Sequence, residues 1–168
     1  MAGAVMLDSP VRRPDPEVEE GERGRSFRNP KVYPDADAAM AHFRTVPDQP
    51  TSLPWILDFV GRRSLGEVEG GVTWKFDPRI FRRDFRRPAH ELLAEVRCRI
   101  ALFRAENGLV TPDIGAFMYD RLGRNAPVIE IPEAYHHMML DQPLLLVTGL
   151  RTLLADWEHS TPLARRAD

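Results

Sequence analysis

The sequence predicts an α/β fold in which about three parallel strands are flanked by helices. Two runs, Arg99–Phe103 and Val128–Ile131, are rich in Ile, Leu, Val and Phe, as strands covered on both faces are. A third run, Ala4–Leu7, is apolar at both odd and even positions, so we expect it to pair parallel to the other two. A helix-forming segment separates the two later runs, and this strand, helix, strand order is typical of a parallel sheet.

The connecting helix is expected to begin at Thr111, which can cap it, with Pro112 in its first turn. Gly123 supplies a stop. Apolar residues recur at spacings of three and four, so one face should lie against the sheet. These residues are Ile114, Phe117, Met118 and Leu122.

A turn over residues 132–137 is expected after Val128–Ile131, followed by a fresh helix. A longer helix after Pro143 should cover the sheet with a broad apolar face. That face comprises Leu146, Val147, Leu150, Leu153, Leu154 and Trp157. His136 therefore falls just beyond a parallel strand, where open α/β sheets place their chemistry.

The spacing of the strands indicates an insertion. About ninety residues separate the first strand from the second, although a crossover needs only about a dozen. We interpret residues 1–10 as the first core strand, 11–90 as a charged loop and helical insertion, 91–160 as the C-terminal α/β core, and 161–168 as a tail. A chain of 168 residues should bury one core in one domain.

The insertion is predicted to hold helices beginning at Asp35, Ser52 and Pro88, each with apolar residues on one side. Large aromatic residues widen the apolar face of the second helix and recur in the extended segment after Gly70-Gly71. Such residues can line a substrate pocket, and packing of the helical layer is the alternative. The candidate substrate-binding residues are Trp55, Phe59, Trp74 and Phe76.

Composition and charge bear on which classes of binding partner and which cellular compartment are expected. A formal net charge of −2 gives no general attraction to nucleic acid or an anionic membrane. The arginine-rich run Arg79–Arg87 is short and is diluted by Asp84, so we interpret it as a helix covering apolar surface rather than a nucleic-acid site. Cys98 has no partner for an internal disulfide. With no apolar run near the ~20 residues of a membrane span and no secretory leader, a cytoplasmic protein is expected.

Three segments in order, residues 5–9, 100–107 and 128–143, resemble the C-terminal half of the α/β-hydrolase family. The last segment is the most telling, because in that family a strand, a turn and the catalytic histidine are followed by an acidic or polar residue and a proline. Here His136 takes the histidine position, and Asp141-Gln142-Pro143 closes the stretch. The resemblance implies a partial α/β-hydrolase fold, with the insertion as the family's helical cap.

The resemblance implies that His136 is the catalytic base, since an imidazole can take a proton and return it near neutral pH. Its neighbour His137 is expected to orient the loop or to pack against the cap. The glycine that commonly precedes the family histidine is Tyr135 here, so the turn is expected to differ. No metal site is expected, because no ligand spacing surrounds the two histidines.

The triad acid is less obvious. The family's frequent glycine and acid positions fall on Ala105 and Gly108. Asp8, at the tip of the first strand, matches the acid position that some members use instead, although it can also simply end a strand. Asp113 is a poorer candidate, because the first turn of a helix favours an acid for structural reasons.

The nucleophile is missing. No serine lies in the Gly-x-Ser-x-Gly elbow of the family, and the oxyanion-hole loop is missing too. The serines tested against this motif are Ser9, Ser26, Ser52, Ser64 and Ser160.

Two functions follow as hypotheses. The first is the His-and-acid half of a Ser-His-Asp type hydrolase of an ester or related bond, without a cofactor and inactive alone. An N-terminal half, either a separate chain or lost by truncation of the coding sequence, would supply the nucleophile and complete a site for a small-molecule substrate. An aspartate nucleophile would instead imply dehalogenation or epoxide opening. The second is a non-enzymatic small α/β binding or interaction protein. Two copies of it could associate through the exposed edge of the first strand.

Overall fold

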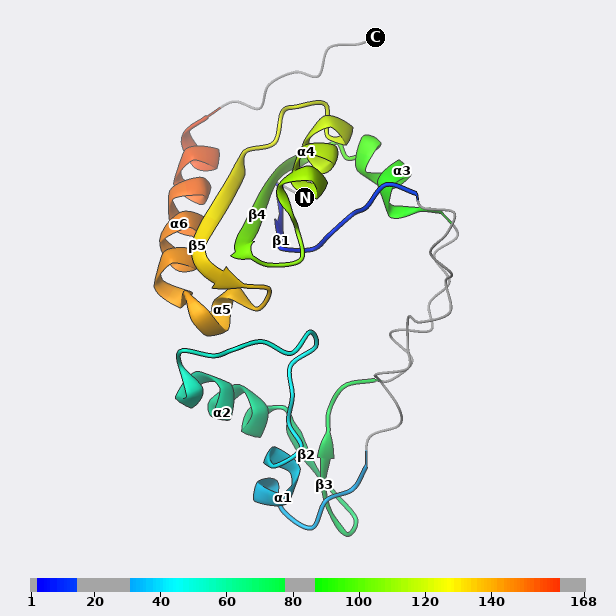
Figure 1. Ribbon diagram of the computed structural model, residues 1–168, viewed down its shortest axis with the longest axis vertical. Coiled ribbons are helices and arrows are strands. Elements are labelled where there is room, and N and C mark those ends of the chain that lie inside the picture. The colour runs from blue at the N-terminus through cyan, green and yellow to red at the C-terminus, as the bar shows by residue number, and fades with distance from the viewer. Residues whose placement is uncertain (1–2, 15–30, 78–86, 161–168) are drawn as a thin grey trace. The chain divides into compact units, whose positions relative to one another are not determined.

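The computed structural model describes residues 3–14, 31–77 and 87–160 (Figure 1). By their contacts the residues divide into two compact units, one formed by Met1–Pro14 with Arg87–Asp168 and the other by Asp15–Arg86. The first unit contains β1 (Gly3–Leu7), α3 (Ala89–Ala94), β4 (Arg99–Asn107), α4 (Pro112–Arg121), β5 (Val128–Tyr135), α5 (Met138–Asp141) and α6 (Pro143–His159). The second contains α1 (Ala36–Met40), α2 (Pro54–Arg63), β2 (Leu65–Val68) and β3 (Gly71–Trp74).

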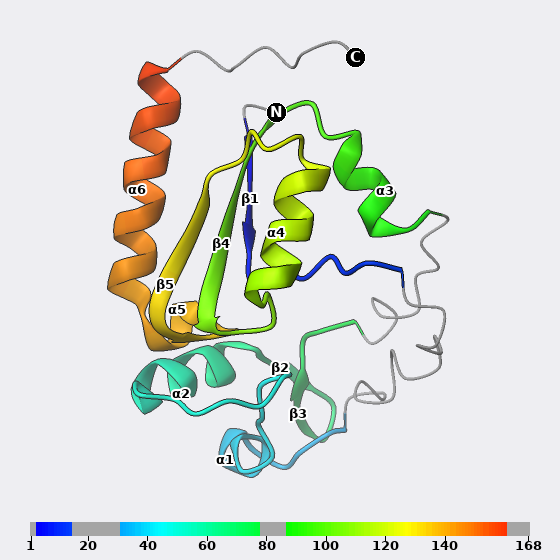
Figure 2. The same cartoon turned by 45° about the horizontal axis from the view of Figure 1, so that its top comes forward.

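The three strands of the first unit form the predicted parallel sheet, in the order β1-β4-β5. Val5 lies opposite Ala101, and Leu102 lies opposite Val128. Because the strands are parallel, their carboxyl ends meet at one edge of the sheet (Figure 2). The expected α/β class with three parallel strands is confirmed.

Helices cover both faces of this sheet, as Figures 1 and 2 show. Side chains of β4 alternate between two hydrophobic clusters, with Phe103 on one face and Leu102 on the other. The first cluster includes Leu146 and Leu153 of α6, and the second includes Met118 of α4. Because β4 is covered on both faces, its sequence is apolar at both odd and even positions.

Helix α4 forms where it was expected, with Thr111 at the N-cap position and Pro112 in its first turn. The Thr111 hydroxyl donates to Asp113 Oδ1 at 2.5 Å instead of capping a backbone N–H. Leu122 ends the helix, and Gly123 follows with a φ of 69°, a conformation that suits glycine.

The apolar face of α6 is narrower than predicted. Leu146 and Leu153 are buried, and Leu150 and Trp157 pack against the same cluster. The expected members Val147 and Leu154 are half exposed. Each of these two lies one residue, or about 100°, around the helix from the buried stripe, and one helix on a sheet buries only the stripe that faces it.

Strand β5 is longer than predicted, because it continues past Ile131 to Tyr135. Pairing with β4 shifts register beyond Ala105 and Ile131, as at a β-bulge. In the irregular stretch Glu133 has a φ of 55°, and its N–H donates to Glu106 Oε2 at 2.7 Å. Pro132 is tolerated because β5 is an edge strand among the described strands. The predicted turn over 132–137 is therefore mostly strand.

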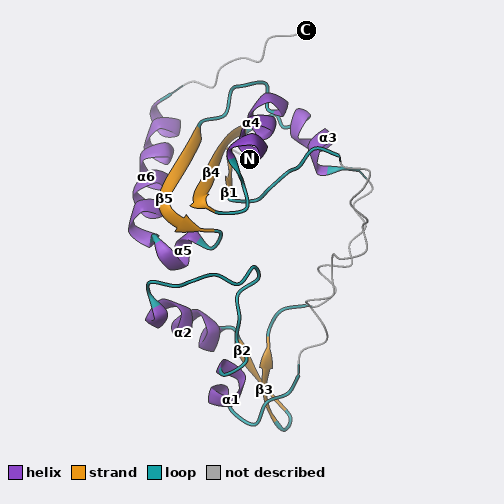
Figure 3. Ribbon diagram, in the orientation of Figure 1, coloured by secondary structure: helices purple, strands orange, loops and turns teal. Residues whose placement is uncertain are grey.

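In its described residues, 31–77, the second unit contains the two predicted helices α1 and α2 and an antiparallel hairpin of β2 and β3 (Figure 3). Asp35 caps α1 by accepting from the Ala38 N–H at 2.8 Å. The hairpin turns at Gly70 and Gly71, both with positive φ. Strand β2 was not predicted, because its four residues include a glycine and show no clear alternation. The role of this unit as a cap is still a prediction.

Several predictions fall outside the described residues, including most of the Arg79–Arg87 run and the tail at 161–168. Within the described residues, no helix has both the length and the apolar character that crossing a membrane requires.

Candidate active site

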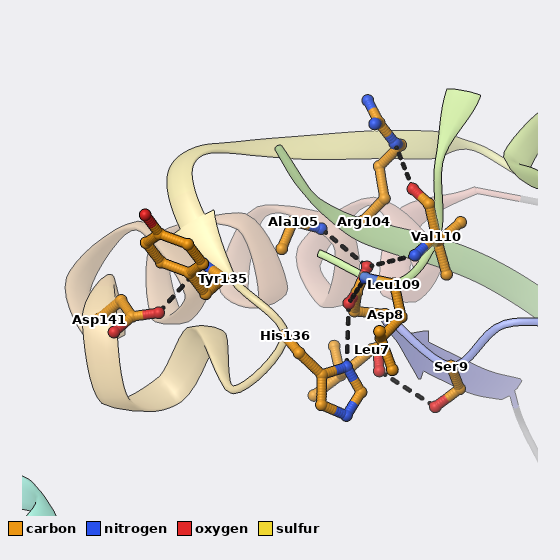
Figure 4. A network of polar contacts seen from close by, with 10 residues as sticks. All are labelled: Leu7, Asp8, Ser9, Arg104, Ala105, Leu109, Val110, Tyr135, His136 and Asp141. Atoms are coloured by element: carbon orange, nitrogen blue, oxygen red, sulfur yellow. Dashed lines mark hydrogen bonds and ion pairs between the residues drawn. The ribbon is translucent and has the colours of Figure 1, made fainter. Parts of the chain in front are cut away.

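The two residues for which a catalytic role was predicted meet at the carboxyl edge of the sheet. Asp8 directly follows β1, and His136 directly follows β5. His136 Nδ1 lies 2.9 Å from Asp8 Oδ2 (Figure 4). The fold thus joins side chains that are 128 positions apart in the sequence.

The Asp8 carboxylate is fully buried, with 0% exposure. Three backbone N–H groups donate to it: Ala105 and Val110 to Oδ1, both at 3.2 Å, and Leu109 to Oδ2 at 2.7 Å. A buried carboxylate needs such donors to offset the loss of hydration. Together with His136 they hold the carboxylate in one place.

The backbone at Asp8 is also specialised. Its φ is 41°, in the left-handed region that aspartate tolerates better than most residues. Its N–H donates to Phe103 O at 2.7 Å, which extends the pairing of β1 with β4. A non-glycine residue in this conformation stores strain that the surrounding hydrogen bonds must offset.

Gly108 leaves the space that the Asp8 carboxylate occupies. A Cβ atom at position 108 would lie 2.5 Å from Asp8 Oδ1 and 2.6 Å from Asp8 Cγ. The family resemblance marked Gly108 as the position of the usual acid. In this chain the absence of a side chain at position 108 makes room for the Asp8 carboxylate.

The geometry determines which nitrogen of His136 is basic. An ionised carboxylate only accepts hydrogen bonds, so Nδ1 must donate to Asp8, and the lone pair of the neutral ring is on Nε2. The His136 side chain is 22% exposed, and in Figure 4 the second ring nitrogen points away from Asp8. The pair can therefore accept a proton at Nε2 while Asp8 stabilises the resulting imidazolium.

The neighbours of His136 complete the loop. The ring of His137 packs edge-on against that of His136, with centroids 4.7 Å apart. The Tyr135 N–H donates to Asp141 Oδ2 at 3.0 Å. Among the described residues the positive-φ position in this region is Glu133 and not Tyr135, so the tyrosine does not need the freedom of the glycine it replaces.

Arg104, on β4, contacts a residue that holds the Asp8 carboxylate. Its Nε donates to Val110 O at 3.0 Å, and the N–H of Val110 is one of the donors to Asp8. Arg104 also forms an ion pair with Glu130, and its side chain is only 11% exposed. Sequence reasoning missed Arg104, and it named Asp141 only as part of the stretch after His136, without a role of its own. The one available signal for Arg104 was a charge inside an otherwise apolar strand.

The candidate substrate-binding aromatics lie in the second unit, and a hollow on α2 is lined by two of them. The hollow, of about 580 Å³, involves Trp55 and Phe59, which are largely exposed. Its lining residues are Trp55, Asp58, Phe59, Arg62 and Arg63. Trp74 instead stacks on Phe43 with centroids 5.2 Å apart, and Phe76 is partly exposed. Their role in substrate binding stays a prediction.

In the part of the chain that the structure describes, no three or more His, Cys, Asp or Glu side chains are grouped to hold a metal ion. The hydroxyl of Ser9, next to Asp8, donates to the carbonyl of Leu7 at 3.1 Å.

The sequence matches no protein-family model and no curated protein. Its structure matches E-2-(acetamidomethylene)succinate hydrolase with a TM-score of 0.67 over 92% of this chain, at 18% sequence identity. The chain has a partial α/β-hydrolase fold. Other solved structures match the same α/β-hydrolase fold over most of this chain. They are the thioesterase domain from the curacin biosynthetic pathway (TM-score 0.60, 15% identity, 95% of this chain) and a hypothetical protein from Pseudomonas aeruginosa PAO1 (0.61, 20%, 93%).

The chain spans only 57–58% of the length of these three structures. The fold that the sequence resemblance implied is confirmed. Residues 5–9, 100–107 and 128–143, which carry that resemblance, build the sheet edge at which Asp8 and His136 lie.

Proposed function

We propose that this chain supplies the acid and the general base of a Ser-His-Asp type hydrolase that cleaves an ester or related acyl bond. Asp8 is the acid and His136 the base. The observation that carries the proposal is the 2.9 Å contact between His136 Nδ1 and a buried, four-donor Asp8 carboxylate. Two structural neighbours are named as a hydrolase and a thioesterase, which agrees with acyl-bond cleavage.

The chemistry follows from the tautomer. Nε2 of His136 takes the proton of a serine hydroxyl as its oxygen attacks the carbonyl carbon, and Asp8 stabilises the imidazolium. The imidazolium then returns the proton to the leaving group as the acyl bond breaks. The same cycle, with water in place of serine, releases the acyl group.

The serine and the oxyanion donors come, in this proposal, from an N-terminal half that is not part of this sequence. Among the described strands, β1 pairs only with β4, so the other edge of β1 presents N–H and C=O groups to a further strand. That edge is the proposed docking position. Self-association of two copies through this edge is the competing outcome, and a concentration-dependent mass in sedimentation would reveal it.

An ester assay tests the proposal. The purified chain is assayed on a short-chain aryl ester, alone and mixed with a candidate half carrying Gly-x-Ser-x-Gly, sought in the DNA upstream of the Met1 codon. We expect activity only in the mixture, with a loss of about 10²–10⁴-fold in His136→Ala. His159→Ala, which alters an exposed histidine, is the matched control and should retain activity.

Two results would contradict the proposal. Activity of the chain alone that disappears in His136→Ala would show that no second half is needed. Activity of the mixture that survives His136→Ala would remove His136 from the mechanism.

The hollow on α2 supports a second candidate, a non-enzymatic binding protein for small apolar molecules. Trp55 is 68% exposed and Phe59 59% exposed, which is unusual for such large apolar side chains. If binding is the function, an apolar ligand will change the tryptophan fluorescence of the wild type but not that of Trp55→Ala, and no mixture will hydrolyse esters.

A further inference from the structure

A buried carboxylate closes the loop that carries His136. Asp141 is 5% exposed, and its Oδ2 accepts from the N–H of Tyr135 at 3.0 Å. The backbone between them is also tied, since the Leu140 N–H donates to His137 O at 2.7 Å and the Gln142 N–H to Met138 O at 2.8 Å. One side-chain and two backbone hydrogen bonds therefore close the segment from 135 to 142 into a loop.

We propose that Asp141 is a positioning residue that keeps His136 against Asp8, an inference that rests on the proposed function. Tyr135 is the residue directly before His136 and the last residue of β5. Fixing its N–H fixes the point from which the His136 backbone leaves the sheet. The hydrogen bond from the Tyr135 N–H to Asp141 Oδ2 lets Asp141 act on His136 through the backbone.

The strand before the loop is held in the same way. The N–H of Glu133 donates to Glu106 Oε2 at 2.7 Å, two residues before Tyr135. Past the bulge, β5 pairs with β4 at Asn107 and Tyr135 only. Side-chain carboxylates thus substitute for regular ladder hydrogen bonds on the approach to His136, and Asp141 is the last of these anchors.

The contact between His136 and Asp8 is sensitive to small displacements of the loop, so the anchor at Asp141 matters. A hydrogen bond between His136 Nδ1 and Asp8 Oδ2 at 2.9 Å is lost when the atoms separate beyond about 3.5 Å. A displacement of under 1 Å at the base of the loop is enough to break it, and misplacement on this scale can cost about 10²-fold in rate.

The test compares variants that keep or remove the acceptor at position 141. Asp141→Asn keeps an oxygen that can accept from the Tyr135 N–H, whereas Asp141→Leu has similar size without an acceptor. Asp156→Ala, at an exposed position on α6, is the control. The readout is the ¹⁵N NMR spectrum of histidine-labelled protein, which distinguishes Nδ1–H from Nε2–H tautomers.

We expect the His136 Nδ1–H signal in the wild type, Asp141→Asn and Asp156→Ala, and its loss or replacement by a mixture of tautomers in Asp141→Leu. In the complemented ester assay Asp141→Leu should lower kcat at least about tenfold with little change in KM. An unchanged Nδ1–H signal in Asp141→Leu would overturn the inference about Asp141 but not the proposed function. Absence of that signal in the wild type would instead overturn the proposed function.

Amide hydrogen exchange in β4 checks that the variants are folded. If Asp141→Leu does not fold, Asp141→Ala serves as the second variant without an acceptor. Loss of folding in both, with Asp141→Asn intact, would assign Asp141 a purely structural role and overturn the inference.

Discussion

Replacing Gly108 by alanine should displace the acid of the proposed site. The new Cβ would lie 2.5 Å from Asp8 Oδ1 and 2.6 Å from Asp8 Cγ, well inside van der Waals contact. The carboxylate has no solvent to move into, because Asp8 is 0% exposed. Any shift also lengthens its bonds from the N–H groups of Leu109 and Val110.

The magnitude follows from these contacts. Overpacking costs about 1–3 kcal/mol, and weakening one hydrogen bond to a charged group adds about 1.5–3 kcal/mol. A single shift of the carboxylate relieves the clash as it weakens the hydrogen bond, so the two costs do not add in full. We therefore expect Gly108→Ala to lower the free energy of unfolding by about 2–4 kcal/mol. Gly115→Ala is the matched control. There the added Cβ meets Val110 Cγ1 at an ordinary 3.7 Å, and alanine in a helix should stabilise by up to about 1 kcal/mol.

Amide hydrogen exchange in β4 measures the free energy of opening for this sheet without interference from the second unit. The expected result is faster exchange in Gly108→Ala and equal or slower exchange in Gly115→Ala. If Gly108→Ala protects β4 as well as the wild type does, the account of Gly108 as the space for the acid is wrong.

Three further predictions follow. Arg104→Met should destabilise β4 by about 1–3 kcal/mol in the same exchange measurement, because it removes the donor to Val110 O, whereas exposed Arg124→Met should change it by less than about 0.5 kcal/mol. The Thr111 hydroxyl is the main cause that holds the pKa of Asp113 below its ordinary value, so Thr111→Val should raise that pKa in an NMR titration. Because folding favours the ionised Asp113, the wild type should lose stability relative to Thr111→Val as pH falls through the folded pKa, and equal pH profiles would contradict this. Trp55→Ala should leave the thermal midpoint unchanged, since this side chain is largely exposed.

The meeting of Asp8 and His136 could be predicted because it depends on the order of elements. Each residue directly follows an apolar strand, and the carboxyl ends of parallel strands share one edge. Helix α4 could be predicted for a different reason: its cap position, proline, apolar spacing and stop are all local in the sequence.

The supporting residues could not be predicted, because their contacts follow no regular spacing in the sequence. Nothing near Gly108 in the sequence indicates that Asp8, a hundred positions earlier, occupies the space beside it. The side chains of Asp141 and Arg104 each bond a backbone group six residues away, and this spacing belongs to neither the helix nor the strand period. The left-handed Glu133 likewise depends on a bulge that pairing with β4 creates.

The most direct test of the central claim is the ¹⁵N spectrum of the His136 imidazole in the wild type and in Asp8→Ala. If Asp8 holds the base as described, the neutral ring of the wild type carries its proton on Nδ1, and that preference disappears in Asp8→Ala. A wild-type ring protonated on Nε2, or the same tautomer in both proteins, would contradict the account.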